Sequence, residues 1–280
     1  MIQFFNTVRQ ILNCDSVQAS EGLSRHLAWQ CRRVFNRFPV ELRIADSRLR
    51  VERPCGVAAL VNAMGEYDFN NMELIRLLLF RTKGTLIDVG ANIGSYTIVA
   101  SEISEATVIS VEPHPVTFRW LRENVRLNGR QNVTCLNLAI SSRDGQIQFT
   151  DGQDLSTNHV ITANEANVSL ISIEGCRLDT ICDRLEVIPD FVKIDVEGHE
   201  PEVLEGFGTY GSLAKLILVE NGERKNVRDW MSKCGFAGPL FAHAKTWVLS
   251  TAKQRRPEDP VYVRKAFLDQ MLDFGFTLSA

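Results

Sequence analysis

The residues best suited to chemistry lie in three short runs, each with a carboxylate at the end of an apolar stretch. In the first, TLIDVGANIGSYT at residues 85–97, an apolar stretch closes on Asp88, a glycine-rich turn follows and an apolar stretch resumes. This pattern predicts a strand, a tight loop and a helix start, whose free amides face a polar or anionic group. Gly90 and Gly94 can take positive φ and let a ligand approach the backbone. We therefore expect a nucleotide-like ligand at Asp88, Gly90, Ala91, Asn92 and Gly94.

A second run, VISVE at residues 108–112, indicates which nucleotide. Glu112 lies 22 residues after Gly90, where nucleotide-binding α/β folds carry an acid for the ribose hydroxyls, and Pro113 follows at the same edge. The turn GANIG lacks two glycines of the dinucleotide fingerprint, and Asp88 would repel a pyrophosphate. The same carboxylate could receive the ammonium of a methionine moiety. The pattern therefore favours S-adenosylmethionine over a nicotinamide dinucleotide.

The third run, FVKIDVEGHEPEVLEG at residues 191–206, combines an apolar strand, an acidic exit at Asp195 and an immediate helix start. Together with DVGANIG, VEPHP, LRENVRLN and Leu178-Asp179, it resembles the FkbM-type S-adenosylmethionine-dependent methyltransferases over roughly residues 85–220. The resemblance implies a class I methyltransferase fold and methyl transfer, usually to a hydroxyl oxygen. It also implies that Glu112 binds the ribose, that Asp195 begins the acceptor site, and that the methionine end of the cofactor meets Asp88, Gly90, Asn92 and Gly94.

Methyl transfer needs an acceptor oxygen aligned with the methyl group and a base that removes one proton. His199 and Glu200 are the candidates for the base, because they follow the strand exit and a histidine accepts a proton near neutral pH. Both also have structural explanations. A protonated His199 would face the positive end of a helix dipole, and Glu200 could be only a favourable N-terminal charge. Asp195 is expected to serve both catalysis and cofactor binding.

Two features near the third run leave alternatives open. Lys193 alternates with apolar residues inside its strand, so it points to a carboxylate of the site or pairs with Glu220 on the adjacent strand. Asp195, Glu197 and Glu220 could hold a divalent cation with oxygen ligands, but Lys193 and helix amides can also satisfy these acids. We expect no metal.

Strand-like and helical patterns alternate from residue 84 to 220, which is typical of a parallel sheet covered on both faces. We expect strands at 85–89, 108–112, 133–138, 191–195 and 215–220, with ligands beyond their carboxyl ends. Asn137 and Ala139, at the end of the third strand, would then meet the adenine. Residues 236–242 and 246–250 predict a closing antiparallel hairpin, whereas 145–180 look polar and irregular, an insertion between the cofactor and acceptor halves.

The expected fold is therefore α/β, a class I (Rossmann-like) methyltransferase fold. It has a mostly parallel seven-stranded sheet, an antiparallel C-terminal hairpin and a small N-terminal helix and hairpin cap. We divide the chain into an N-terminal extension at 1–56, a methyltransferase domain at 57–256 and a helical tail at 257–280. Residues 57–82 look helical, and Glu66 and Tyr67 either help to close the cofactor pocket or mark a helix break at Gly65.

The N-terminal extension contains a basic amphipathic pattern and a hairpin pattern. Residues 22–38 place six apolar side chains on one helical face and arginines largely elsewhere: Leu23, Leu27, Cys31, Val34, Phe35 and Phe38. Such a helix lies on a membrane, recognises an anionic acceptor or, more often, packs on its own domain, and we expect the last. VELRI at 40–44 and LRV at 49–51 alternate apolar and charged residues around a turn, which predicts a hairpin.

Composition limits the class of protein. A chain of 280 residues with 45% hydrophobic residues suits one large domain with an ample core. The net charge of −3 gives no case for nucleic acid, and the absence of an apolar run of about 18 residues argues against a membrane span. Seven cysteines without a C-x-x-C pair, and a start without a signal-peptide pattern, favour reduced thiols in a cytoplasmic protein. The sequence does not determine the oligomeric state.

The acceptor is the part of the function that the sequence defines least. The polar insertion, with DGQD at 151–154, and the acid-rich exit after Asp195 suit a hydroxyl-rich molecule. We expect O-methylation of a hydroxyl on a carbohydrate or glycosylated metabolite, so the partner is a small molecule or glycan. A polyketide-type natural product is the alternative, although it would need a more apolar lid than DGQD at residues 151–154. More distant alternatives are a nicotinamide-dependent oxidoreductase, disfavoured by the missing fingerprint, and a non-catalytic cofactor-binding module, which need not keep KIDVEGHE.

Overall fold

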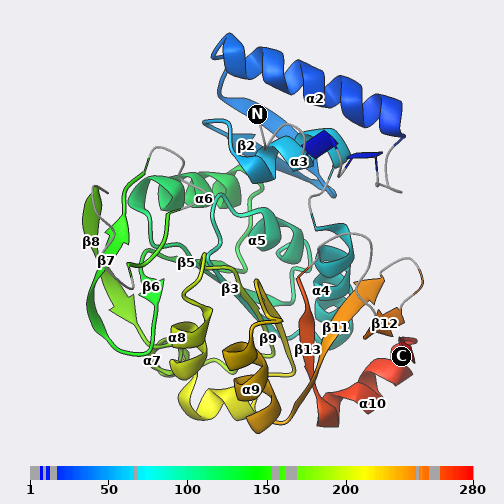
Figure 1. Cartoon of the computed structure of the whole chain (residues 1–280), viewed down its shortest axis with the longest axis vertical. Coiled ribbons are helices and arrows are strands. Elements are labelled where there is room, and N and C mark those ends of the chain that lie inside the picture. The colour runs from blue at the N-terminus through cyan, green and yellow to red at the C-terminus, as the bar shows by residue number, and fades with distance from the viewer. Residues whose placement is uncertain are drawn as a thin grey trace.

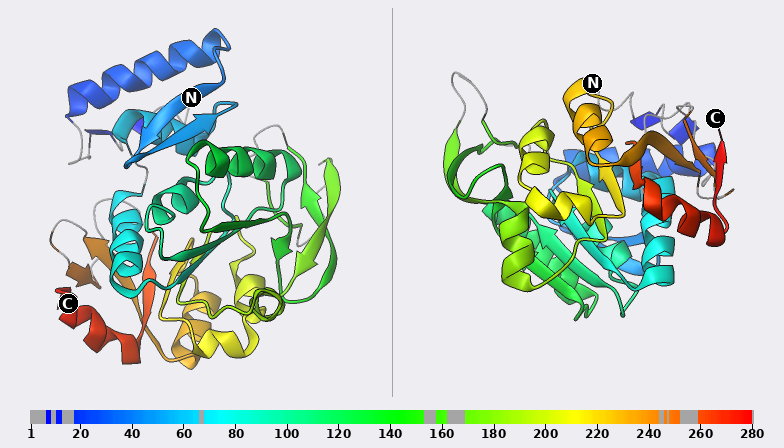
Figure 2. Two further views of the ribbon diagram at one scale, coloured as in Figure 1. Left: turned by 180° about the vertical axis from the view of Figure 1, so that it is seen from behind. Right: turned by 90° about the horizontal axis from the view of Figure 1, so that it is seen from below.

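One large sheet runs through the molecule, with helices on both faces and a small helical and hairpin layer at one end (Figures 1 and 2). The structure is a computed structural model, and it describes residues 7–8, 11–12, 18–65, 68–152, 158–161, 169–243, 246, 248–251 and 259–279. Glu66, Tyr67, Gln153, Asp154, Asn167 and Val168 lie outside the described residues. Within the described residues, no helix has the length and apolar character needed to cross a bilayer.

The central sheet has nine strands in the order β14-β12-β11-β13-β10-β9-β3-β4-β5. Its parallel half consists of the five strands that the sequence predicts, each boundary within two residues: β3 (Thr85–Val89), β4 (Thr107–Val111), β5 (Val133–Leu136), β9 (Phe191–Ile194) and β10 (Leu216–Val219). Two antiparallel strands, β13 (Val261–Arg264) and β11 (Phe236–His243), continue the sheet beside β10. These seven strands confirm the predicted class I arrangement of a parallel sheet closed by antiparallel strands.

The C-terminal edge of the sheet differs from the prediction. Strand β11 pairs with β12 (Val248–Ser250) as the predicted hairpin, but β13 lies between β11 and the parallel strands. The predicted helical tail is therefore wrong for residues 261–264, where two β-branched residues and a tyrosine favour a buried strand. Helix α10 (Lys265–Asp273) and edge strand β14 (Thr277–Ser279) follow. The two edge strands β12 and β14 raise the predicted seven strands to nine.

Alternate residues of the parallel strands face two separate cores. Leu86 and Val108 face one core and their neighbours Ile87 and Ile109 the other, which explains why these strands read as continuous apolar runs. The helices that pack on the sheet in the first core are α4 (Phe69–Thr82), α5 (Ser95–Ala100), α6 (Pro115–Leu127) and α10, and the N-terminal layer adds further residues to this core. Those of the second core are α7 (Leu178–Leu185), α8 (Glu200–Glu205) and α9 (Lys225–Lys233). A short 3-10 helix, η1 (Gly208–Ser212), follows α8.

The N-terminal layer contains α2 (Ala19–Val34), the hairpin β1 (Val40–Ile44) and β2 (Ser47–Val51), and α3 (Gly56–Met64). The predicted hairpin is confirmed, with Ile44 opposite Ser47 at its turn. Two asparagines, one in α6 and one directly after it, hold the free edge of β2. Asn124 Oδ1 accepts the Arg50 N–H at 2.7 Å, and Asn128 Oδ1 accepts the Arg48 N–H at 2.9 Å. A helix break at Gly65 (φ 87°) separates α3 from α4.

Helix α2 does not bury the predicted apolar face. It buries Gly22, His26 and Trp29 instead, and the Trp29 ring packs edge-on against Phe38 with 5.3 Å between centroids. Leu27 is 58% exposed and Val34 79% exposed. Trp29 offers the largest apolar surface on the helix, so the side that contains it packs inward, and the predicted packing face is wrong.

The insertion at 145–180 is largely regular, so its predicted irregularity is wrong for the described residues. Strands β7 (Gly145–Thr150) and β8 (Leu170–Cys176) form an antiparallel pair, which β6 (Ala139–Ile140) extends into a three-stranded sheet. A small core, which includes Phe149, Val160 and Ile173, lies on one face of this sheet.

Candidate active site

A cavity of about 210 Å³ opens at the carboxyl ends of β3, β4 and β9. The turn after β3, the start of α3, the small sheet and the loop after β9 form its walls. Eight predicted site residues line it: Gly90, Ala91, Asn92, Glu112, Pro113, Ala139, Asp195 and His199. The parallel topology thus brings residues more than 100 positions apart to one place, as the strand-end argument predicts.

Glu112 is held by two backbone amides at the bottom of this cavity. Its Oε2 accepts the Asn92 N–H at 2.9 Å, and its Oε1 accepts the His114 N–H at 3.0 Å. Burial raises the pKa of the carboxyl group to about 7. Each oxygen keeps a second lone pair, so the ionised carboxylate can still accept hydrogen bonds from two neighbouring hydroxyls. This arrangement of acceptor oxygens fits the ribose hydroxyls of a nucleoside.

Asn137 supports the same strand end without lining the cavity. Its Nδ2 donates to the Glu112 carbonyl at 2.9 Å and to the Pro113 carbonyl at 2.8 Å. The structure therefore gives this residue a bracing contact, and its contact with adenine stays a prediction. The apolar walls beside Ala139 come from residues that the sequence analysis did not select: Leu138, Ile140, Phe149 and Val160.

Asp88 faces protein groups. Its side chain is wholly buried, accepts a hydrogen bond from Thr97 Oγ1 at 2.7 Å and lies 3.5 Å from Lys193 Nζ. Asp88 and Gly94 do not line the cavity. At Gly94, where φ is 95°, a Cβ would lie 2.7 Å from Leu121 Cδ1, so packing against α6 explains this glycine. The predicted direct contacts of these two residues with a ligand are not part of the observed geometry.

Lys193 is the single lysine or arginine among the described lining residues. Its Nζ donates to the Gly90 carbonyl at 3.0 Å and lies 3.3 Å from Asp195 Oδ2 and 3.5 Å from Asp88 Oδ1. These two acids raise the pKa of Lys193 despite its burial, so the ammonium stays charged. Of the two predicted partners, a carboxylate of the site and Glu220, the structure shows the first.

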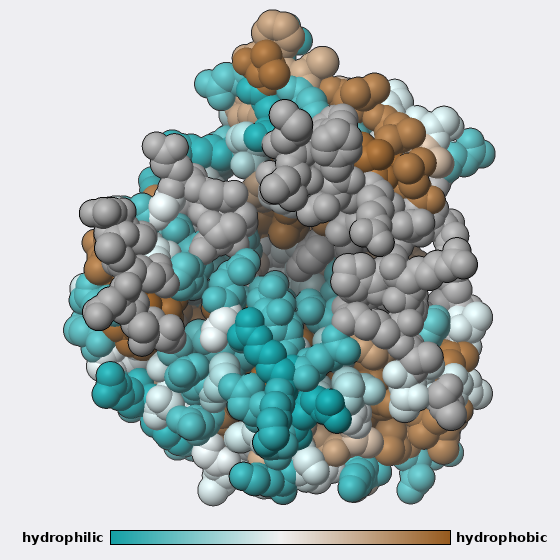
Figure 3. All heavy atoms as spheres, in the orientation of Figure 1, coloured by the Kyte–Doolittle hydropathy of each residue, from teal (hydrophilic) through white to brown (hydrophobic). Residues whose placement is uncertain are grey.

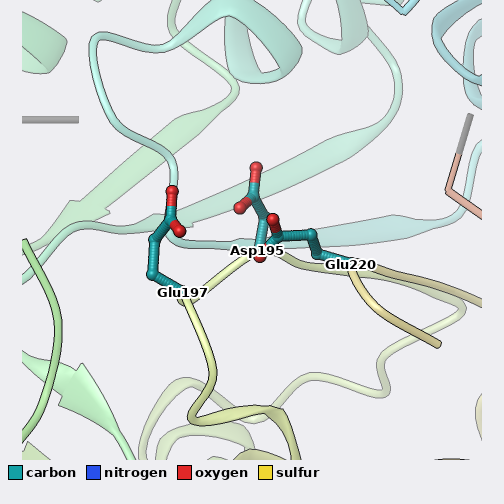
Figure 4. A group of neighbouring side chains, drawn as sticks. All are labelled: Asp195, Glu197 and Glu220. Atoms are coloured by element: carbon teal, nitrogen blue, oxygen red, sulfur yellow. The ribbon is translucent and has the colours of Figure 1, made fainter. Parts of the chain in front are cut away.

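Three carboxylates meet at the exit of β9 and β10. Figure 4 shows Asp195, Glu197 and Glu220 converging, and one oxygen of each lies within 4.8 Å of the others. Burial and the negative charges of Asp195 and Glu197 raise the pKa of Glu220 to about 8. Burial and nearby acids likewise raise the pKa of Asp259 to about 7. A cation among these acids would favour their ionised forms, so this part of the cavity suits a cationic ligand.

His199 and Glu200, the two predicted bases, have different surroundings. His199 lines the cavity and is 5% exposed; its Nε2 lies 3.0 Å from Ser141 Oγ and its Nδ1 3.5 Å from Glu202 Oε2. Burial lowers the pKa of His199, so the ring is neutral near pH 7 and can accept a proton. Glu200 is fully buried outside the cavity lining.

The contacts of Glu200 are structural. Its Oε1 accepts the Gly198 N–H at 2.9 Å, and its Oε2 lies 3.4 Å from Arg224 Nη1. These contacts hold the turn that enters α8 and leave no direct path to the cavity. The geometry therefore supports His199 and not Glu200 as the candidate base.

Two groups that the sequence analysis did not select also shape the site. The hydroxyl of Tyr96, a lining residue, donates to the carboxylate of buried Asp68. His114 caps α6 by accepting the Val116 N–H on Nδ1 at 3.3 Å, and its Nε2 lies 3.1 Å from Asp151 Oδ1. His114 thus ties the small sheet to the strand end that carries Glu112. The VEPHP sequence contained this signal, because a histidine before a proline at a helix start is placed to cap.

Comparisons with known proteins identify the family of the chain. A family profile, the Methyltransferase FkbM domain, matches residues 88–237. Hexuronic acid methyltransferase AglP of Haloferax volcanii is 35% identical, over 53% of this chain and 61% of that protein, so the chain spans less than two thirds of this relative. Methyltransferase sdnD of Sordaria araneosa is 27% identical, over 51% of this chain and 68% of that protein. The crystal structure of M. jannaschii TYW2 in complex with AdoMet aligns with a TM-score of 0.41 and 15% identity, over 81% of this chain and 86% of that chain. The family match covers more than half of the chain and includes both glycine-turn and KIDVEGHE runs, so the chain belongs to the FkbM methyltransferase family, whose cofactor is S-adenosylmethionine.

Proposed function

We propose that the protein transfers a methyl group from S-adenosylmethionine to a hydroxyl oxygen of a carbohydrate or glycosylated metabolite. The observation that carries this proposal is the cavity in which Glu112, the Lys193–Asp195 pair and His199 meet at the ends of three parallel strands. A ribose acceptor, a charged acidic wall and a neutral base are the groups that this chemistry needs.

Different residues of the cavity would contact different parts of the cofactor. Glu112 would accept hydrogen bonds from the ribose hydroxyls, and the apolar side chains of Leu138, Phe149 and Val160 would cover the adenine. Asp195 faces the methionine end, where Lys193 holds it in place at 3.3 Å. When bound, the cofactor supplies an electrophilic methyl group on a positively charged sulfur.

The acidic wall favours the reactive form of the cofactor. Asp195 and Glu197 create a negative field, which stabilises a cationic sulfonium more than its neutral product. The reaction leaves a neutral sulfur, which these carboxylates no longer attract, so they hold the product less tightly than the substrate.

His199 is proposed to take the acceptor proton. An aliphatic hydroxyl is a weak nucleophile at neutral pH, and removal of its proton during transfer makes it competent. His199 is neutral because burial lowers its pKa, and Glu202 lies 3.5 Å from Nδ1, where it can stabilise the imidazolium that forms. Ser141 Oγ lies 3.0 Å from Nε2, so the acceptor proton would reach Nε2 either through the Ser141 hydroxyl or after the acceptor hydroxyl replaces that contact.

The acceptor class rests on the acids at the exit of β9 and on the hexuronic acid methyltransferase among the relatives. Hydroxyl groups of sugars are donors that Asp195 and Glu197 can bind. The polyketide alternative would need Phe149 and Val160 to face the acceptor and not the adenine, because these two side chains make the inner wall of the small sheet more apolar than its polar sequence predicts.

The test is incubation of the protein with methyl-labelled S-adenosylmethionine and separate panels of nucleotide sugars, glycans, natural-product alcohols, RNA and protein. Label that is stable to mild base and appears in the sugar or glycan panels supports the proposal, because an ether survives conditions that cleave an ester. Label in RNA or protein alone would refute the acceptor and leave the methyltransferase assignment standing.

A further inference from the structure

Helix α2 exposes a stripe of apolar side chains that the described part of the chain leaves uncovered. The α2 stripe comprises Leu27, Cys31, Val34 and Phe35, which follow one another along one side of the helix and its end. Leu27, Val34 and Phe35 are 58, 79 and 67% exposed, and Cys31 is also exposed. Figure 3 shows apolar surface along this helix at the top of the molecule.

The stripe is separate from the side of α2 that packs inward. Gly22, His26 and Trp29 are the buried residues of the helix, and α3 is its main neighbour. Leu27 and Val34 sit on a different side, about 100° or more around the helix axis, because successive residues turn by about 100°. Packing within the described chain therefore does not account for the apolar character of the stripe, and such a contiguous apolar surface indicates an interaction site.

Cationic side chains border the stripe. Arg32 and Arg33 are exposed at its C-terminal end, and the Arg37 guanidinium lies 5.6 Å over the Phe35 ring. Residues 19–56 carry eight arginines against four acids, a net charge of +4, in a chain whose net charge is −3. The remainder of the chain, with the acid-rich cavity, is therefore net negative, and the two ends of the molecule differ in sign.

We propose that the α2 stripe docks the protein onto the surface of an anionic lipid bilayer. Leucine, valine and phenylalanine side chains enter the boundary between headgroups and acyl chains, and flanking arginines meet lipid phosphates. The negative remainder of the molecule is repelled by the same surface, so the protein approaches with α2 first. A second copy of the chain is a poorer occupant, because it would bring two arginine-rich borders together.

The experiment is sedimentation of the full chain with sucrose-loaded vesicles of phosphatidylcholine alone and of phosphatidylcholine mixed with phosphatidylglycerol. We expect binding to the mixed vesicles that decreases as salt is raised. Leu27→Glu/Val34→Glu should lower the partition coefficient by about tenfold or more, and so should Arg32→Glu/Arg33→Glu. Ile188→Glu, a change at a 56% exposed apolar residue elsewhere, and the α9 charge reversal Arg228→Glu/Lys233→Glu are the matched controls and should keep wild-type binding.

Affinity for S-adenosylhomocysteine serves as the check that each variant is folded. The proposal is overturned if the wild-type chain does not sediment with the mixed vesicles, or if the stripe variants sediment as well as the controls. It is also overturned if analytical ultracentrifugation shows a dimer that Leu27→Glu/Val34→Glu dissociates, because the stripe would then belong to a second copy. None of these readouts requires turnover, so failure of this proposal and failure of the proposed methyl transfer are distinguishable.

Discussion

Glu112 gives the sharpest test of how the cavity binds its cofactor, because its raised pKa makes binding depend on pH. Burial raises this pKa to about 7, so in the free protein the carboxyl group is mostly protonated at pH 6 and mostly ionised at pH 8. A carboxylate that accepts two ribose hydroxyls must be ionised. Binding therefore competes with protonation, and affinity should rise with pH.

The size of the effect follows from the fraction of ionised Glu112. With a pKa of about 7, that fraction is roughly one tenth at pH 6 and nine tenths at pH 8. S-adenosylhomocysteine should therefore bind about tenfold more weakly at pH 6 than at pH 8. Glu112→Gln should remove this dependence and, at pH 8, should cost about 1 to 3 kcal/mol through the lost charged hydrogen bonds, or about 5- to 150-fold in Kd.

Titration calorimetry at pH 6, 7 and 8 measures both quantities. Glu220 and Asp259 also have a raised pKa, about 8 and about 7, so pH dependence that persists in Glu112→Gln is assigned to them. Glu123→Gln, at an exposed acid of α6, is the control and should bind like the wild type. The reasoning is refuted if Glu112→Gln keeps the wild-type pH dependence and a Kd within about twofold of the wild type.

Four further predictions concern the rest of the site. His199→Ala should cut turnover by about 100-fold or more and leave S-adenosylhomocysteine affinity unchanged. Glu200→Gln should lower the melting temperature and leave turnover unchanged. Equal turnover in the two variants would contradict the assignment of His199 as the base. Lys193→Met should destabilise the fold by about 3 to 5 kcal/mol in urea titrations, because it leaves Asp88 and Asp195 without their cationic partner. A loss of stability below about 1 kcal/mol would contradict this pairing. Gly90→Ala should lower stability and cofactor affinity far more than Gly129→Ala, which has a similar φ but open space around its Cβ; equal losses would show that backbone strain alone matters. Chelation with EDTA should leave turnover unchanged, because Lys193 already supplies a cation to the acids; activity restored only by added Mg²⁺ would instead assign those acids to a metal.

The parallel half of the fold could be predicted because strands that are buried on both faces appear in the sequence as continuous apolar runs. The five parallel strands are short apolar runs ended by acids, asparagine or glycine, and the sequence predicts each of them within two residues. Cavity residues at strand ends follow from topology alone, which is why Glu112 and Asp195 lie where they are expected. Strand β13 was missed because a run as short as residues 261–264 lies beside charged residues that also suit a helix.

The contacts of Asp88 could not be predicted, because they depend on strand order. In the sheet, β9 lies next to β3, and Asp88 stands directly opposite Lys193 in the register. Without the order of the strands in the sheet, the sequence does not show which acid lies opposite which lysine. The face of α2 was missed for a related reason. Spacing shows which side chains share a side of a helix, but the position of Trp29 against its neighbours decides which side is buried.

Phe149 was missed although the sequence contained its signal. Ile147 and Phe149 alternate with glutamines in GQIQFT, a strand pattern with one apolar face. The polar composition of the surrounding segment hid this alternation. In the structure that face forms the small core beside Ala139 and supplies an apolar wall of the cavity.

The contacts at Gly90 join the glycine-turn run and the KIDVEGHE run into one physical unit. A Cβ at Gly90 would lie 1.8 Å from the Asp195 carbonyl oxygen, so the absence of a side chain there serves the contact between two strand exits rather than access for a ligand. The Gly90 carbonyl in turn accepts a hydrogen bond from Lys193, which also pairs with Asp195. A change at any of the three displaces the other two. We therefore expect substitutions at Gly90, Lys193 or Asp195 to change S-adenosylhomocysteine affinity and turnover together, whereas His199→Ala should change turnover alone.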